Sequence, residues 1–393
     1  MRILMLSDAY FPRVNGVSTS IKTFRDDIHN LGHQCTLVAP EYPHSPEDSD
    51  DANIVRIPSW RVPFDPEDRL LVWPRLMAWA STLEPQAYDI IHVQTPFTAH
   101  YAGTRLAQRL GAPLVETYHT YFEHYLHHYV PALPPALTKT FARRITVSQC
   151  HSAAHIISPS RQMADALRAY GVSSPITVLP TGMPTSGFIK GDRGRFRALN
   201  DIPEDRPVAL FVGRIAHEKN IDFLLRMAVE LRERIPDILM LIAGEGPAER
   251  HVRGLIGALD LARNVCLLGN MDRGQTLRDC YRGADIFVFA SRTETQGLVL
   301  LEAMAQGTPV VSTAVMGTAD VLAGMHGATV APENEAEFAR LAAEILRSPE
   351  HRTKLSSLAE ADAQAWSSRR FAERFIGLYE SMSAAPSCER DAA

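Results

Sequence analysis

Residues 208–234 read VALFVGRIAHEKNIDFLLRMAVELRER. An uninterrupted apolar run, Val208–Val212, leads through Gly213 and a short polar loop into a helical segment, Ile221–Arg234. Apolar runs without polar alternation are typical of strands in a parallel sheet that is covered on both faces. The sequence therefore predicts a strand followed by a helix, and ligands bind at the loops beyond the carboxyl ends of such strands.

The same alternation of apolar runs and helical segments extends along the whole chain in both directions. In the first half it predicts strands at Arg2–Leu6, Gln34–Ala39, Ile54–Ile57, Ile90–Val93, Pro113–Thr117, His155–Ile157 and Ile176–Val178. In the second half it predicts strands at Val208–Val212, Ile238–Ala243, Val265–Leu268, Ile286–Phe289 and Pro309–Ser312. The intervening helices are expected at Val17–Leu31, Thr98–Leu110, Arg161–Tyr170, Ile221–Arg234, Ala248–Leu259, Thr276–Arg282, Leu298–Gln306 and Glu335–Leu346. We therefore expect an α/β protein with two facing, doubly wound parallel-sheet (Rossmann-like) domains.

A cluster of proline, glycine, serine and threonine at residues 180–187 (PTGMPTSG) marks the boundary between the two halves. We expect an N-terminal domain at residues 1–184 and a second domain at residues 185–367. A last helix, about Ser368–Met382, has an apolar stripe that allows it to cross back to the first domain. This helix and a small polar tail form residues 368–393.

The composition is that of a soluble globular enzyme. Of the 393 residues, 46% are hydrophobic and 22% charged, and the formal net charge is −5. These values exclude extensive disorder and argue against a general nucleic-acid binder, which needs a basic surface. Five cysteines without zinc-ligand spacing indicate reduced thiols and a cytoplasmic protein. No apolar run reaches the roughly 20 residues that span a bilayer, and the first one, which ends before Asp8, is too short for a signal peptide.

Two loops at the carboxyl ends of predicted strands carry groups suited to a diphosphate. In the first loop, Asn15 and Gly16 precede a helix whose amino-terminal N–H groups favour an anion, and glycine allows a close backbone approach. In the second loop, Gly213 is followed by Arg214 and Lys219, which offer a planar fork and a compact charge. The alternatives are an ordinary helix cap at Asn15 and two solvated surface cations.

A third loop carries two carboxylates. Glu294 lies in the loop, Gly297 opens the next helix, and Glu302 lies inside that otherwise apolar helix. A carboxylate in such a place is costly to bury unless it accepts good hydrogen bonds, which two vicinal sugar hydroxyls can donate. The amides of Gln296, Gly297 and Leu298 at the helix start are suited to a phosphate or sugar oxygen. The alternative is that Glu302 forms a salt bridge or lies at the solvent edge.

A histidine follows the predicted strand Pro113–Thr117. His119 lies just beyond the carboxyl end of this strand, where a parallel sheet would place a ligand. Histidine is suited to hydrogen bonding and proton transfer near neutral pH. The alternative is a core histidine whose hydrogen bonds are satisfied within the protein.

Together, these motifs resemble in order and spacing the retaining glycosyltransferases of family GT4, which have the GT-B fold. The resemblance covers nearly the whole chain. Within that family, residues 8–17 (DAYFPRVNGV), 117–121 (TYHTY) and 293–298 (TETQGL) are most similar to bacterial diacylglycerol glucosyltransferases. Those enzymes move a sugar from a UDP-sugar to a membrane lipid hydroxyl. Two positions depart from the family pattern: Gln94 stands where many relatives carry histidine, and Met183-Pro184 stands where an acidic or amide residue is usual.

The resemblance implies how the nucleotide part of the donor would be held. Arg214 and Lys219, in the loop that Gly213 opens, would bind the diphosphate and neutralise charge on the leaving nucleotide. Gly16 would let the backbone of the first domain touch that diphosphate from the opposite side. Apart from the resemblance, we expect backbone and loop contacts around Asn270, at residues 269–271, to contribute to the choice of base.

The resemblance also implies roles at the sugar. Glu302 would bind the ribose hydroxyls, and Glu294 the hydroxyls near positions 3 and 4 of the donor sugar. His119 would meet the donor sugar beside the acceptor hydroxyl. The amides that would contact sugar and phosphate are those of Gln296, Gly297 and Leu298.

The direction of charge flow predicts a reaction without a metal or other cofactor. Breaking the anomeric bond builds negative charge on the departing diphosphate, which fixed cations and helix amino termini stabilise. The resemblance implies front-face attack with retention, in which the leaving phosphate takes the proton of the acceptor hydroxyl. We expect no covalent nucleophile among the carboxylates.

A stretch without any acidic residue, residues 124–164, suggests a membrane surface as partner. Residues 130–145 mix apolar side chains with Lys139, Arg143 and Arg144, as an interfacial helix does. Each cation near an anionic surface contributes about 1 kcal/mol to binding. We therefore expect a peripheral protein on the inner face of the cell membrane, with added contacts from Trp60, Phe64, Leu70, Leu71 and Trp73. The alternative is a core helix with a basic edge.

Three other functions remain open on the sequence alone. The nearest is a mannosyltransferase that uses GDP-mannose and a lipid or glycan acceptor. A nucleotide-sugar 2-epimerase shares paired doubly wound domains, but it would convert the donor without any acceptor. A catalytically silent sugar-nucleotide sensor is disfavoured, because the full set of charged donor-site residues is present.

Overall fold

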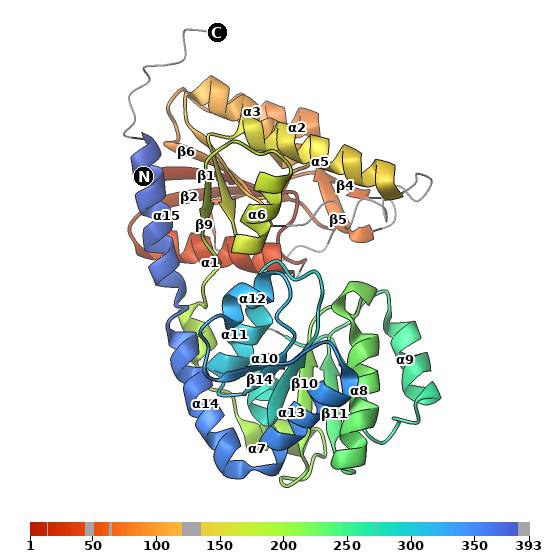
Figure 1. Ribbon diagram of the computed structural model, residues 1–393. Coiled ribbons are helices and arrows are strands. Elements are labelled where there is room, and N and C mark those ends of the chain that lie inside the picture. The colour runs from red at the N-terminus through yellow and green to blue at the C-terminus, as the bar shows by residue number, and fades with distance from the viewer. Residues whose placement is uncertain (14, 44–50, 63–64, 120–134, 273, 384–393) are drawn as a thin grey trace. The chain divides into compact units, whose positions relative to one another are not determined.

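The computed structural model describes residues 1–13, 15–43, 51–62, 65–119, 135–272 and 274–383, with the backbone alone at 65–68 and 135–139. The chain forms two compact units. Unit 1 comprises Met1–Thr181 and a C-terminal segment that begins at Ser368, and unit 2 comprises Gly182–Ser367 (Figure 1). The division lies close to the boundary expected after residue 184.

Unit 1 is built around a parallel sheet with the strand order β3-β2-β1-β6-β7-β8-β9. Its strands are β1 (Arg2–Leu6), β2 (Gln34–Pro40), β3 (Ile54–Ile57), β6 (Ile90–Val93), β7 (Leu114–Thr117), β8 (His155–Ser158) and β9 (Ile176–Val178). All were predicted to within one residue at each end. The order reverses between β1 and β6, so the loops that follow these two strands lie at the topological switch point, where doubly wound sheets bind ligands.

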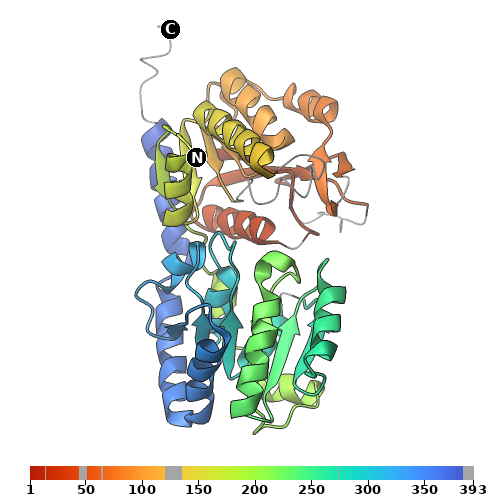
Figure 2. The same ribbon diagram turned by 45° about the vertical axis from the view of Figure 1, so that its right-hand side comes forward.

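Helices cover the sheet of unit 1. They are α1 (Gly16–Asn30), α2 (Trp73–Ala80), α3 (Thr98–Leu110), α5 (Pro135–Ser152), α6 (Arg161–Ala169) and the C-terminal α15 (Ser368–Ser383). The predicted return of the last helix to the first domain is confirmed, because α15 packs on α1 in both views (Figures 1 and 2). The rings of Phe375 and Phe24 meet at this contact, with centroids 4.1 Å apart.

Unit 2 contains a second parallel sheet with the strand order β12-β11-β10-β13-β14-β15. Its strands are β10 (Val208–Val212), β11 (Leu239–Ala243), β12 (Val265–Gly269), β13 (Ile286–Phe289), β14 (Val310–Ser312) and β15 (Ala328–Val330). The winding reverses between β10 and β13, which are direct neighbours. The switch point of this sheet therefore lies beyond the ends of the strands that precede the Arg214 and Glu294 loops.

The helices of unit 2 are α7 (Arg193–Leu199), α8 (Ile221–Arg234), α9 (Glu249–Ala258), α10 (Gln275–Gly283), α11 (Leu298–Ala305), α12 (Gly317–Leu322), α13 (Glu335–Arg347) and α14 (Pro349–Gln364). Short 3₁₀ turns lie at η1 (Thr185–Phe188) and η2 (His217–Lys219). Right-handed crossovers place helices on opposite faces on the two sides of a switch point. Accordingly, α8 and α13 pack together on one face, whereas α10, α11 and α14 form a separate group (Figures 1 and 2).

The elements that the sequence did not predict are short or polar. They are α2, α7, α12, α14, β15 and an antiparallel hairpin formed by β4 (Ser59–Val62) and β5 (Asp65–Leu71). β5 begins with Asp65, Pro66 and Glu67, and α14 has few large apolar residues. Neither segment shows the apolar runs or regular spacing by which the other elements were recognised. Leu71 is buried in the core, which makes its predicted role in a membrane contact wrong.

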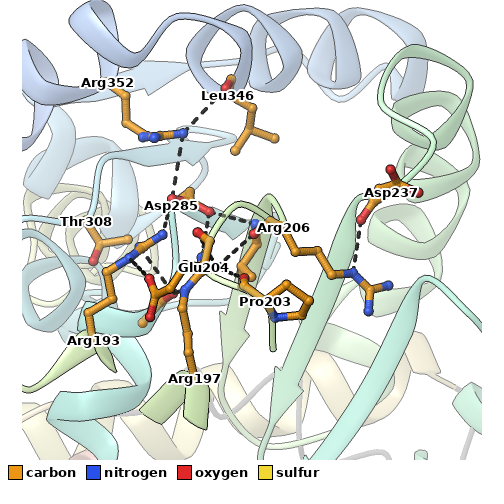
Figure 3. Close-up of polar contacts among 12 residues, drawn as sticks. Arg193, Arg197, Pro203, Glu204, Arg206, Asp237, Asp285, Thr308, Leu346 and Arg352 are labelled. Atoms are coloured by element: carbon orange, nitrogen blue, oxygen red, sulfur yellow. Dashed lines mark hydrogen bonds and ion pairs between the residues drawn. The ribbon is translucent and has the colours of Figure 1, made fainter. Parts of the chain in front are cut away.

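A buried ion cluster connects the amino ends of strands β10 and β13 of unit 2, opposite the edge at which these strands end (Figure 3). Asp285, directly before β13, accepts hydrogen bonds from the fully buried Arg197 (2.9 Å) and from the backbone N–H of Val208 (2.8 Å). Arg193 also donates to this carboxylate at 3.1 Å. The remaining Arg197 donors bond to backbone carbonyls, including that of Pro203 at 2.7 Å. Such complete pairing is what a buried guanidinium requires.

Candidate active site

Two loops of unit 2 meet at the switch point of its sheet. The loop after β10 runs from Gly213 to Asn220, and the loop after β13 runs from Ala290 to Gly297. Asn220 donates a side-chain hydrogen bond to the carbonyl of Ala290 at 3.2 Å. The N–H of Arg292 also donates to the carbonyl of Glu218, at 3.4 Å. The fold therefore brings together two of the three loops that the sequence singled out.

The Gly213 loop is also packed tightly against the loop that follows β11. A side chain at Gly244 would place its Cβ 2.0 Å from the carbonyl oxygen of Gly213, so only glycine fits there. Gly213 itself has a φ of +156° and donates its N–H to the carbonyl of Ala243 at 3.0 Å. Arg214, the next residue, is exposed. The backbone that carries Arg214 is thus fixed while its side chain reaches the solvent-facing edge.

Lys219 and Glu294 form an ion pair across these two loops. The Lys219 ammonium lies 2.6 Å from a carboxylate oxygen of Glu294, and both side chains are largely buried, with 17% and 22% exposed. The sequence predicted a role for each residue in donor binding but did not predict that they touch. Partial burial strengthens the attraction relative to an exposed pair. The pair therefore fixes a cation and a carboxylate side by side at the switch point.

The start of α11 has the conformation that a glycine provides. Gly297 is in the left-handed region (φ +95°) at the amino-terminal cap of α11, and Gln296 beside it is buried. Leu298 begins the helix. The first amides of any α-helix lack partners within that helix and point along its axis. Here they point out of the same edge of the sheet as the Lys219–Glu294 pair.

Glu302 is held by a tyrosine that sequence reasoning missed. The hydroxyl of Tyr281, on α10, donates to a carboxylate oxygen of Glu302 at 2.7 Å. Tyr281 is buried and Glu302 half-buried. A buried tyrosine hydroxyl needs a hydrogen-bond partner, and this requirement could have pointed to the contact.

Asn270, predicted to help choose the base, follows β12. Its N–H donates to the carboxylate of Glu245 at 3.3 Å.

In unit 1, the loop after β1 begins with a buried carboxylate. Asp8 accepts hydrogen bonds from the hydroxyl of Thr95 (2.9 Å) and from the backbone N–H of Ala99 (2.9 Å). Burial raises the pKa of Asp8 to about 6. Further along the loop, the side chain of Asn15 caps α1 by accepting from the N–H of Ser18 at 2.8 Å, as the alternative interpretation held. Gly16 is exposed at the first position of α1, and a Cβ there would meet no atom within 4 Å.

His119 lies next to the switch point of unit 1. Its Nε2 is 2.8 Å from the side-chain oxygen of Gln94, which directly follows β6. Burial lowers the pKa of His119 to about 4, so the ring is neutral at neutral pH. Gln94, one of the two positions that depart from the family pattern, is therefore the hydrogen-bond partner of His119, a contact that the sequence did not indicate.

Comparisons with known proteins give matches to both halves of the chain. The model of the family "Glycosyltransferase Family 4" matches residues 14–186, and that of "Glycosyl transferases group 1" matches residues 192–362. An alpha-monoglucosyldiacylglycerol synthase from Streptococcus pneumoniae is 31% identical over 320 residues, which are 79% of this chain and 71% of that protein. The chain belongs to glycosyltransferase family 4.

Other proteins that are similar to this glycosyltransferase have names that indicate different substrates. An alpha-monoglucosyldiacylglycerol synthase from Acholeplasma laidlawii is 28% identical over 79% of this chain and 80% of that protein. A GDP-mannose-dependent alpha-mannosyltransferase from Mycolicibacterium smegmatis is 26% identical over 82% of each chain. The structure of a sucrose-phosphate synthase from Thermosynechococcus elongatus superposes with a TM-score of 0.80 at 21% identity, covering 98% of this chain and all of that one. The expected α/β GT-B fold is thereby confirmed.

The predicted membrane surface of the glycosyltransferase lies on α5. Arg143 and Arg144 are exposed on this helix. Phe141, which precedes them, is 60% exposed. Other residues of α5 are buried, so one side of the helix belongs to the core and the other carries these groups. Trp60 on β4 is 68% exposed. The side chain of Lys139, like residue Phe64, lies outside the described residues.

The described part of the chain contains no helix that is both long and apolar enough to pass through a bilayer. It also contains no group of three or more histidine, cysteine, aspartate and glutamate side chains placed to hold a metal ion.

Proposed function

We propose that this glycosyltransferase moves a hexosyl group from a UDP-sugar to the hydroxyl of a membrane lipid, diacylglycerol, with retention of the anomeric configuration. The observation that carries the donor site is the Lys219–Glu294 pair at the switch point of unit 2, beside Arg214 and the start of α11. The lipid acceptor is supported by the two relatives named alpha-monoglucosyldiacylglycerol synthase. The product would be an α-glycosyl glycolipid.

The charges at the donor site suit the cleavage of a sugar–diphosphate bond. In this proposal Arg214 and Lys219 bind the diphosphate, and the amides of Gln296 to Leu298 bind phosphate or sugar oxygens. Because Glu294 holds Lys219 and the amides belong to the backbone at the start of α11, these groups are in place before the reaction and stabilise the negative charge that develops on the leaving nucleotide. A metal ion is not required in this scheme. The leaving phosphate takes the proton of the acceptor hydroxyl as the new bond forms on the same face.

The remaining site residues orient the donor. Glu294 accepts hydrogen bonds from the donor sugar, and its pairing with Lys219 holds its carboxylate close to the diphosphate. Glu302, held by Tyr281, accepts from the ribose hydroxyls. The roles of Gly16 and His119, on unit 1, stay predictions from the family resemblance.

A donor-by-acceptor screen tests the proposal. UDP-glucose, UDP-galactose, UDP-glucuronate and GDP-mannose are each incubated with diacylglycerol or with a glycan acceptor, and nucleotide release is followed. We expect release from a UDP-sugar that depends on added diacylglycerol, and NMR of the product should show an α linkage. Acceptor-independent conversion of the donor would instead indicate an epimerase.

A paired variant tests the donor site directly. Arg214→Ala with Lys219→Ala should abolish donor turnover, because both cations that offset the leaving diphosphate are lost. Arg226→Ala with Arg234→Ala is a matched control, since these arginines lie on α8 of the same unit and away from the switch point. Unchanged turnover in the first double variant would contradict the assignment.

The mannosyltransferase alternative is favoured by one observation, the 26% identity to the GDP-mannose-dependent enzyme. In the screen above it predicts turnover of GDP-mannose and none of UDP-glucose.

We also propose that the enzyme is a cytoplasmic, peripheral protein that binds the anionic inner surface of the cell membrane through the exposed side of α5. Phe141 supplies apolar area, and Arg143, Arg144 and Lys139 supply charge, each cation worth about 1 kcal/mol near such a surface. Sedimentation with anionic and with neutral liposomes should differ, and Arg143→Ala with Arg144→Ala should remove the difference. Equal sedimentation of the native chain with both liposomes would contradict this part of the proposal.

A further inference from the structure

A chain of hydrogen bonds connects His119 to the C-terminal helix through the interior of unit 1. His119 bonds to Gln94 (2.8 Å), and the side-chain amide of Gln94 lies 3.1 Å from both ring nitrogens of His92. His92 in turn bonds to the hydroxyls of Thr117 (2.7 Å) and Tyr379 (2.6 Å). Apart from the half-buried His119, every residue in this series of hydrogen bonds is buried.

The chemistry of the Gln94 amide sets the direction of the bond to His119. The amide oxygen only accepts hydrogen bonds, whereas a neutral imidazole has one N–H and one lone pair. His119 Nε2, which faces that oxygen, must therefore carry the proton. It follows that the lone pair of the neutral ring is on Nδ1.

The other end of the amide contacts His92. Its nitrogen only donates, and it faces His92, whose pKa burial lowers to about 3, so that this ring too is neutral and offers a lone pair. Thr117 and Tyr379 fix the plane of the His92 ring by bonding its two nitrogens. Rotating the Gln94 amide by half a turn would reverse the donor and acceptor in both contacts, so the orientation of this amide, which is only 1% exposed, and the tautomer of His119 are coupled.

We propose that Gln94 is a positioning residue that keeps His119 in the Nε2–H tautomer, so that its Nδ1 presents a lone pair to a substrate hydroxyl. The inference rests on the proposed function for the identity of that hydroxyl, which belongs to the donor sugar or to the lipid acceptor. The choice of tautomer matters because a protonated Nδ1 has no lone pair and so cannot accept a hydrogen bond from the substrate hydroxyl. His92, Thr117 and Tyr379 act further back, by fixing the amide.

The tautomer is measurable in the full-length protein without any substrate. The chain contains 15 histidines, so the protein is labelled with ¹⁵N-histidine and the His119 signals are assigned by their loss in His119→Asn. Two-bond ¹H–¹⁵N correlation spectra at neutral pH then report which ring nitrogen is protonated. We expect an Nε2–H ring in the native protein, a mixture or the Nδ1–H form in Gln94→Leu, and a retained Nε2–H ring in Gln94→Glu, whose oxygens still accept.

Kinetics provide the second readout. Gln94→Leu should lower kcat about tenfold, which corresponds to about 1.4 kcal/mol, with little change in the KM of the nucleotide sugar. Gln94→Glu should recover part of this loss. Gln149→Leu is the matched control, because Gln149 is another buried glutamine of unit 1 whose amide donates to the carbonyl of Pro96 (2.7 Å). Gln149→Leu should leave the His119 spectrum, kcat and the KM of the nucleotide sugar unchanged.

The outcomes separate the two proposals. An Nδ1–H ring in the native protein, or an unchanged ring in Gln94→Leu, overturns the role of Gln94 whatever the substrate is. A similar loss of kcat in Gln149→Leu also overturns it, by assigning the effect to general packing. If no lipid or sugar acceptor supports turnover, the proposed function fails while the tautomer measurement still decides on Gln94. Should Gln94→Leu not fold, the native spectrum and Gln94→Glu decide.

Discussion

Tyr281→Phe removes one hydroxyl and leaves the ring that fills the core. The hydroxyl donates to the Glu302 carboxylate at 2.7 Å, and a hydrogen bond to a charged group contributes about 1.5–3 kcal/mol. Glu302 is half-buried, so water replaces part of the lost interaction. About 1 kcal/mol should remain as a loss of orientation at the carboxylate. If Glu302 binds the ribose hydroxyls, the Kd for UDP should rise roughly fivefold.

Isothermal titration with two ligands separates orientation from general damage. UDP and its 2′,3′-dideoxy analogue are titrated into the native protein and into Tyr281→Phe. The dideoxy analogue has no ribose hydroxyl for Glu302 to bind, so its affinity should be the same in both proteins while that of UDP falls.

Thr308→Val serves as the matched control for this measurement. The Thr308 hydroxyl donates to the backbone carbonyl of the same Tyr281 at 2.7 Å, so the variant loses a neighbouring buried hydrogen bond but keeps the contact to Glu302. Its UDP affinity should stay within about twofold of the native value, because it loses only stability, typically about 1 kcal/mol. An equal loss of affinity for both ligands in Tyr281→Phe would refute the link between Tyr281, Glu302 and the ribose.

Three other perturbations test the fold around the sites. Asp285→Ala leaves the fully buried Arg197 without its carboxylate and should lower the free energy of unfolding by about 3–5 kcal/mol in urea titrations, whereas a loss below 1 kcal/mol would contradict the cluster's importance. Because burial raises the pKa of Asp8 to about 6 from 3.8, its contribution to stability is present below pH 4 and lost as the pH rises through 6. Unfolding at pH 4 and pH 7 should therefore show about 3 kcal/mol of pH dependence that Asp8→Asn lacks, and equal pH dependence in both proteins would argue against it. Gly317→Ala would place a Cβ 2.0 Å from the backbone oxygen of Thr295 and should displace the Glu294 loop, lowering kcat/KM at least tenfold in donor assays; native kinetics would show that the loop yields at no cost.

Most of the sheet architecture was predictable because it depends on local pattern. The strands of both parallel sheets are apolar on both faces, and this property is visible in runs of four or five residues such as Val208–Val212 and Ile286–Phe289. β15 was not predicted because Ala328–Val330 contains only one large apolar residue, and the β4–β5 hairpin was not predicted because β5 begins with polar residues. Helix α14 escaped because its sequence is largely polar.

The candidate site was predictable as a set of loops but not as a set of contacts. Arg214, Lys219, Glu294 and Glu302 were recognised because charged residues follow apolar strands or interrupt an apolar helix. Nothing in their spacing indicates that Lys219 and Glu294 form an ion pair. Likewise, a buried tyrosine hydroxyl needs a hydrogen-bond partner, but the sequence does not indicate that the partner of Tyr281 is Glu302.

By itself, the sequence determined the succession of strands and helices along the chain and the placement of polar loops at strand ends. These features follow from hydrophobic periodicity and turn chemistry, which act over a few neighbouring residues. Only the tertiary structure decided which distant side chains meet. His92 and Tyr379 are bonded although they are 287 positions apart, because the C-terminal helix returns to pack on α1. These contacts depend on the order of the strands within each sheet and on how the helices pack, and local sequence patterns determine neither.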